Sequence, residues 1–62
     1  MEILYKDNHI VVCIKPSGVL SAKDSSGAKN MTDILAQELG ENEIYPVHRL
    51  DREVSGVMVY AL

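Results

Sequence analysis

Two short apolar runs, at residues 10–14 and 57–60, constrain the fold of this chain most strongly. Both are rich in β-branched residues, which favour strands because a branched side chain packs well on a pleated surface. The first run is continuously apolar, a pattern that predicts a strand covered on both faces. With 62 residues in all, the chain cannot supply two covering layers. We therefore expect a sheet that this chain covers only in part.

The rest of the sequence predicts a hairpin and one helix. Residues 2–7 form a second strand-like run, which Asp7-Asn8, a turn-favouring pair, separates from the apolar run that follows. Asn30 or Thr32 can cap a helix that ends at Gly40. Its apolar residues recur at the spacing of one helix face: Met31, Ile34, Leu35 and Leu39. The sequence predicts an α+β fold over residues 1–62, with a helix packed on a mixed, largely antiparallel sheet.

Composition limits the classes of function. Cys13 is the only cysteine and lies in an apolar run, so we expect it to pack as a small hydrophobic residue. With two isolated histidines the chain has no metal-ligand spacing, and we expect neither a metal nor a cofactor. A formal net charge of −3 argues against a polyanion binding the whole surface, so any nucleic-acid contact must be local. The chain lacks both a membrane-length apolar run and a signal peptide, so we expect a cytoplasmic protein.

The stretch HRLDREVSG, residues 48–56, places five ionisable side chains in its first six positions. If residues 47–51 are extended, Arg49 and Asp51 share one face, about 6.5 Å apart along the strand. A cation at that distance favours an ionised carboxylate, which can act as a nucleophile or base. The alternative is a solvated turn with weak exposed ion pairs. His48 has no partners for a catalytic triad, so a structural histidine bonded to backbone is favoured over a general base.

These residues carry a resemblance to a known family. HRLDREVSGVMVYA resembles the signature of the RluA-type pseudouridine synthases, H-R-L-D-x-x-T/V-S/G-G followed by an apolar strand. Upstream, ILYKDNHIVVCIKPSGVL is similar to the opening of the family: a strand, D-N, an apolar strand and K-P-x-G. The two segments stand in the family's order with a helix between them. The likeness covers nearly the whole chain, and the HRLD block is its most specific part.

The resemblance implies an enzyme that isomerises uridine to pseudouridine in structured RNA, either rRNA or tRNA. Asp51 would be the catalytic carboxylate, and Arg49 would bind the substrate by stacking or by gripping phosphate. Metal and cofactor are not implied. The remaining matched positions would support the site structurally: His48, Leu50, Ser55, Gly56, Lys15 and Pro16.

Two departures from the family pattern affect what the chain can do. Val54 stands where threonine is frequent in the family. The sequence also stops shortly after HRLD, before the motifs that supply an active-site tyrosine and a basic residue. We therefore expect an N-terminal fragment of the catalytic domain that is inactive alone. The alternative is a small non-catalytic interaction module in which HRLDRE is a protein-binding turn.

Overall fold

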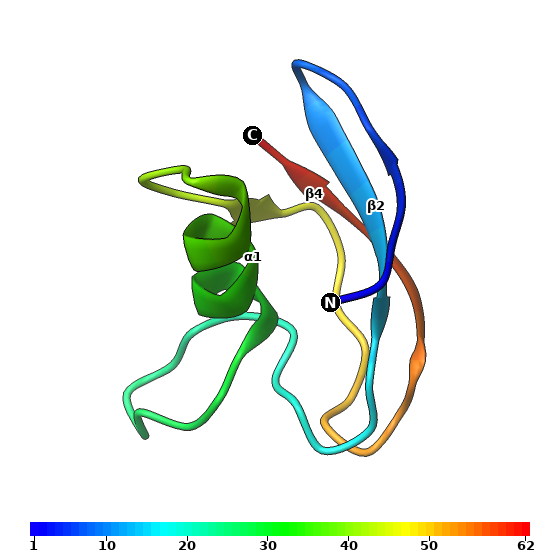
Figure 1. Cartoon of the computed structure of the whole chain (residues 1–62). Coiled ribbons are helices and arrows are strands. Elements are labelled where there is room, and N and C mark those ends of the chain that lie inside the picture. The colour runs from blue at the N-terminus through cyan, green and yellow to red at the C-terminus, as the bar shows by residue number, and fades with distance from the viewer.

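The computed structural model describes all residues, 1–62, as four strands and one helix. The elements are β1 (Ile3–Lys6), β2 (Ile10–Lys15), α1 (Met31–Leu39), β3 (Tyr45–Pro46) and β4 (Gly56–Ala61). The strands lie in the order β1-β2-β4-β3, and α1 stands beside the sheet (Figure 1). All neighbouring strands pair antiparallel, and the one parallel contact is an isolated bridge between Leu20 and Asn30. The predicted α+β fold is confirmed.

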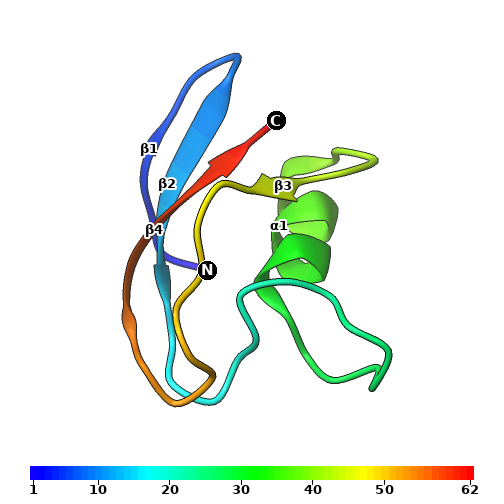
Figure 2. The same ribbon diagram turned by 180° about the vertical axis from the view of Figure 1, so that it is seen from behind.

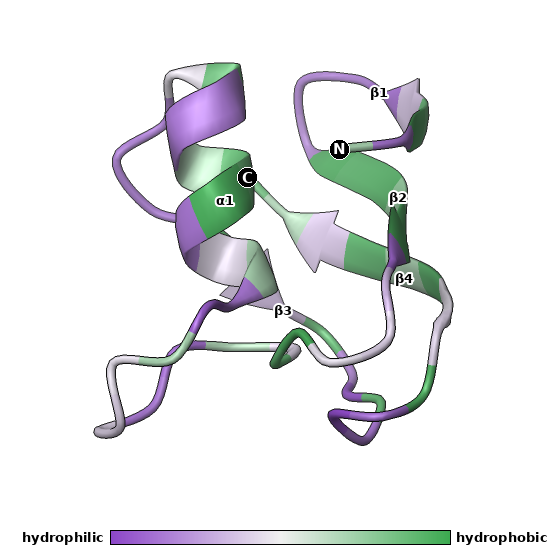
Figure 3. Ribbon diagram, turned by 60° about the horizontal axis from the view of Figure 1, so that its bottom comes forward, coloured by the Kyte–Doolittle hydropathy of each residue, from purple (hydrophilic) through white to green (hydrophobic).

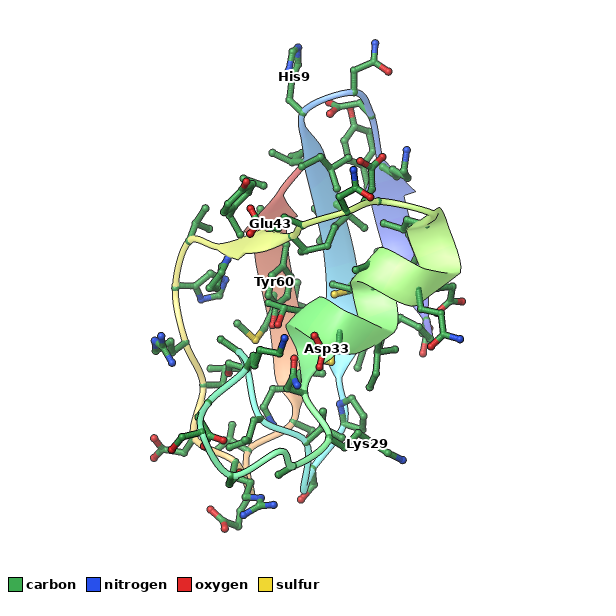
Figure 4. All side chains as sticks on the ribbon, turned by 90° about the vertical axis from the view of Figure 1, so that its left-hand side faces the viewer. His9, Lys29, Asp33, Glu43 and Tyr60 are labelled. Atoms are coloured by element: carbon green, nitrogen blue, oxygen red, sulfur yellow. The ribbon has the colours of Figure 1, made fainter.

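The predicted hairpin joins β1 to β2, and the Asp7 side chain holds its turn. Asp7 Oδ1 accepts hydrogen bonds from the backbone N–H groups of His9, at 2.7 Å, and Ile10, at 2.9 Å. Its Oδ2 accepts the hydroxyl of Tyr5 at 2.8 Å. These donors favour the charged carboxylate and, led by the His9 N–H, lower the pKa of Asp7 from 3.8 to about 2. His9 itself projects from the tip of the hairpin (Figure 4).

Acid is expected to weaken the fold through Asp7. Because the folded-state pKa lies below the unfolded value, the stabilisation is present above pH 3.8 and is lost as the pH falls to about 2. Urea unfolding at several pH values checks this. Asp7→Asn keeps an acceptor oxygen but cannot ionise, so its free energy of unfolding should fall less steeply over this range. Parallel pH profiles for the two proteins would contradict the assignment.

One face of the sheet is covered and the other is not. In β2, Val11, Cys13 and Lys15 are fully buried, while the alternate residues are only half-buried. Within this chain residues 10–14 are covered on one face, which confirms the expectation of a sheet that the chain covers only in part. The structure has one helix, and it packs on the Val11 face. Figure 3 shows that β2 and much of β4 are apolar. The face without a covering layer within the chain is made by these residues: Ile10, Val12, Ile14, Val57, Val59 and Ala61.

The helix forms as the sequence predicts, and its ends are capped. The Asn30 side chain accepts the N–H of Asp33 at 2.9 Å, and Gly40 closes the helix with a φ of 72°. Met31 and Leu35 are fully buried. The core between helix and sheet has eight residues: Val11, Cys13, Val19, Met31, Leu35, Ile44, Met58 and Tyr60. Cys13 packs there as expected. This helix of 9 residues is too short to span a membrane, and the chain has no other.

Candidate active site

The residues that carry the HRLD motif lie on the loop between β3 and β4, here named the HRLD loop (residues 47–55). The chain bends at Val47 and His48, so the condition of an extended segment over residues 47–51, under which Arg49 and Asp51 would share one face, is not met. Figure 1 and Figure 2 both show this loop beside the turn that follows β2, at the lower end of the molecule. Residues 15–21, which include that turn, are named the clamp segment because they bind the HRLD loop repeatedly.

Lys15 is the most buried part of this contact. Its side chain is fully buried, and its Nζ donates hydrogen bonds to three backbone carbonyl oxygens. One belongs to Pro16, at 3.1 Å, and two belong to the HRLD loop: Arg52, at 2.9 Å, and Val54, at 2.7 Å. A lysine ammonium has three donors, so all of them are used. Lys15 thus connects the end of β2 to the part of the HRLD loop that follows Asp51.

The turn after Lys15 adds two further bonds to the same part of the loop. The Gly18 N–H donates to the carbonyl oxygen of Arg52 at 2.7 Å, and the Ser17 hydroxyl donates to that of Glu53 at 2.7 Å. Gly18 has a φ of 89°, a conformation that favours glycine. Pro16 is exposed and contributes its carbonyl to Lys15. The K-P-x-G motif therefore binds backbone carbonyl oxygens of the HRLD loop, through the side chains of Lys15 and Ser17 and the N–H of Gly18.

Ser21 contacts the part of the HRLD loop that precedes Asp51. The sequence did not single out this residue. Its hydroxyl donates to the carbonyl oxygen of Leu50 at 2.7 Å and accepts the Leu50 N–H at 2.9 Å. Leu50 is half-buried and packs against the core, so it anchors the loop as the resemblance implies. A Cβ on Gly56 would lie 3.3 Å from Leu50 Cδ1. Glycine at position 56 therefore allows the Leu50 side chain to approach the backbone closely.

Asp51 is exposed, directly after Leu50, and its carboxylate makes no hydrogen bond or ion pair. Its backbone oxygen accepts the N–H of Val54 at 3.0 Å, which closes a tight turn. The surface has two hollows, both beside β3 and the start of the HRLD loop, and Asp51 lines neither of them. Arg49 is exposed and borders both of them. Asp51 forms neither the pair with Arg49 nor the exposed ion pairs of a solvated turn that the sequence left open, because the two ion pairs of the structure lie elsewhere.

His48 bonds to the backbone of β4. Its Nε2 accepts the backbone N–H of Val59 at 3.0 Å. Strand β3 ends at Pro46, opposite Tyr60, so the imidazole takes the place that a continuing strand would take beside β4. His48 thus fixes the start of the HRLD loop against β4.

Ser55 makes no contact that would show its role, and the chain has no cluster of metal-binding side chains. Ser55 is exposed, and the structure shows no hydrogen bond from its side chain. Its predicted role in the return to β4 remains a prediction. Groups of three or more His, Cys, Asp or Glu side chains that could hold a metal ion do not occur in the chain.

Comparison with known proteins assigns this arrangement to a family. The model of the RNA pseudouridylate synthase family matches residues 9–62, which include the clamp segment and the whole HRLD loop. The chain belongs to this family. Curated relatives in Pasteurella multocida and Yersinia pestis, both named "tRNA pseudouridine synthase C", are 38% and 40% identical to it over 65 residues.

These alignments cover all of the chain but only part of each relative. The share of the relative is 26% for the Pasteurella multocida protein and 25% for that of Yersinia pestis. A relative of the same name in Pectobacterium carotovorum is 38% identical, and the chain spans 17% of it. The chain therefore corresponds to about a quarter, or less, of these RNA pseudouridylate synthases.

Proposed function

We propose that this chain provides the aspartate-bearing part of a pseudouridine synthase that acts on tRNA, with Asp51 as its catalytic carboxylate. The observation that carries the proposal is the combination of an exposed, unpaired carboxylate with a loop held at both ends. Ser21 and His48 hold the loop before Asp51, and Lys15 holds it after Asp51. A structural aspartate would be expected to bond its neighbours, as Asp7 does. The tRNA substrate follows the names of the relatives.

The reaction needs a base to be cleaved from its ribose, turned and rejoined through carbon, with no net gain or loss of atoms. An ionised carboxylate can attack the ribose or otherwise assist cleavage of the glycosidic bond. Asp51 meets the requirement of access, because its side chain is exposed and no hydrogen bond turns it away from solvent.

Arg49 is the proposed contact to the RNA. Its guanidinium is exposed and no carboxylate within the chain neutralises it, so it is available for phosphate or for stacking on a base. It lies two positions before Asp51 and borders a hollow next to β3. Since the chain carries a net charge of −3, such a local cation is needed where the RNA backbone comes close.

The proposal is limited to a part of the active site. The apolar face of β2 and β4 that lacks a cover supports the view that the 62 residues do not form a complete RNA-binding pocket. We propose that the chain alone does not turn over RNA, and that the remainder of the pocket comes from sequence that corresponds to the other three quarters of the relatives. The site of action is proposed to be the cytoplasm.

A chimera tests the proposed function. Residues 1–62 replace the aligned segment of the Pasteurella multocida tRNA pseudouridine synthase C, and pseudouridine formation is measured on tRNA transcripts. The chimera is expected to be active, because the clamp segment and HRLD loop arrive as one folded unit. Residues 1–62 alone are the control and should give no product. A folded chimera that binds tRNA but forms no pseudouridine would contradict the proposal.

A further inference from the structure

One hydroxyl group, that of Ser21, holds both backbone polar groups of Leu50. The oxygen accepts the Leu50 N–H and donates its own proton to the Leu50 carbonyl, at 2.9 and 2.7 Å. Ser21 is only 5% exposed, so water has little access to compete for these bonds. Both groups of Leu50 must face the same oxygen, which restricts the backbone of Leu50 from its N–H to its carbonyl.

Ser21 is itself fixed in the core. Its carbonyl oxygen accepts the hydroxyl of Tyr60, a fully buried residue of β4, at 2.6 Å. Figure 4 shows the Tyr60 side chain close to β4, beside the helix. Burial raises the pKa of Tyr60, so its hydroxyl keeps the proton that it donates. On the other side, Leu20 accepts the N–H of Met31 at 2.8 Å, which joins the same segment to the first residue of α1.

The side chain of Leu50 is held as well, between the core and Gly56. The next residue is Asp51, whose carboxylate makes no hydrogen bond of its own. The direction in which this carboxylate points therefore depends on the backbone that precedes it and on the turn closed by Val54. We propose that Ser21 is a positioning residue of the synthase, which sets the place of the Asp51 carboxylate by fixing Leu50.

This inference rests on the proposed function of Asp51 and adds a residue that the HRLD and K-P-x-G motifs do not contain. The other clamp contacts differ in position. Lys15, Ser17 and Gly18 all bind carbonyl oxygens of residues 52–54, after Asp51. Ser21 alone in the clamp segment binds the residue before it. Ser17 is therefore the control: another serine hydroxyl, here an exposed one, bound to the same loop at the same distance of 2.7 Å.

The test uses the chimeric synthase with Ser21→Ala or Ser17→Ala, assayed well below the thermal midpoint of each protein. A catalytic group displaced by a fraction of an ångström to 1 Å loses rate, so kcat should fall about tenfold or more in Ser21→Ala. The KM for tRNA should change less than kcat, because the loop before Arg49 is also held by the bond of His48 to Val59. Ser17→Ala should keep the parent kcat. Ser21→Thr, which retains the hydroxyl, should recover most of the lost rate.

An effect on stability alone gives a different result. A merely structural Ser21 would lower the thermal midpoint and leave kcat unchanged in the folded enzyme, and that outcome would overturn the proposal. An equal loss of kcat in Ser17→Ala would overturn it too. If Ser21→Ala does not fold, Ser21→Cys, which keeps the size and weakens both hydrogen bonds, is used with the same expectations.

A spectroscopic measurement separates this inference from the proposed function. In the folded chimera, active or not, Ser21→Ala should speed hydrogen exchange of the Leu50 amide and shift the Asp51 carboxyl carbon resonance. Ser17→Ala should change neither. If the parent chimera is inactive but Ser21→Ala still causes these spectral changes, the catalytic role of Asp51 is refuted and the positioning role of Ser21 stands. An unchanged Asp51 resonance in Ser21→Ala would refute the positioning role.

Discussion

Asp51→Asn is expected to abolish pseudouridine formation by the chimeric synthase and to leave tRNA binding intact. The substitution keeps the size of the side chain and removes the charge on which attack by a carboxylate depends. Loss of a covalent or acid–base catalytic group commonly lowers kcat by on the order of 10⁴-fold or more. The fold should not change, because the Asp51 carboxylate has no partner within the chain.

The measurement is a single-turnover assay of pseudouridine in tRNA, together with a filter-binding titration. Glu53→Gln is the matched control, since it removes the same charge from another exposed residue of the HRLD loop. Its side chain makes no hydrogen bond, and Ser17 binds only its backbone oxygen. Near-parent turnover by Asp51→Asn would end the assignment of this residue. A similar loss in both variants would assign the effect to loop charge.

Lys15→Met is expected to cause the largest loss of stability. Methionine fills a similar volume and donates no hydrogen bond, so the Val54 carbonyl oxygen loses its partner and the Arg52 carbonyl oxygen keeps only the Gly18 N–H. A polar group left unpaired in this way costs about 1–3 kcal/mol. We expect the free energy of unfolding to fall by about 1–3 kcal/mol.

Urea unfolding of the chimera measures the difference. Lys23→Met is the control, because Lys23 is 70% exposed and forms a solvent-exposed ion pair with Asp33 at 3.7 Å. Such pairs contribute about 0–1 kcal/mol, so the control should stay close to the parent. Equal stabilities of the two variants would show that the three bonds of Lys15 give the fold no net support.

Local pattern was enough to predict the hairpin, the helix and its caps. Asp7, Asn30 and Gly40 act within three or four residues of their own position, where sequence rules apply. Burial of Cys13 and the backbone bond of His48 were predicted from the kind of residue and its surroundings. The family resemblance correctly gave the order of strand, helix and HRLD loop, and the family itself.

What the sequence left open depends on contacts between distant residues. The sequence did not decide whether residues 47–51 are extended; the His48 ring accepts the Val59 N–H, and the chain bends at Val47 and His48. A lysine is usually predicted at the surface, and Lys15 is buried because carbonyls 37 and 39 positions away surround its Nζ. Ser21 lies in a polar stretch with no local signal, and its partner Leu50 is 29 positions along the chain.

The pairing of β2 with β4 has a consequence for the order of folding. Val12 pairs with Val59 and Ile14 with Val57, so the centre of the sheet closes a long stretch of chain before it gains any hydrogen bond. Pairings of this kind carry a large loop-closure entropy and form slowly, whereas the β1–β2 hairpin is local. The bonds from Lys15 to residues 52–54 run alongside this closure. Asp51 thus gains its surroundings only at the step that joins the two ends of the chain, and no partly folded hairpin or isolated helix can carry a formed site.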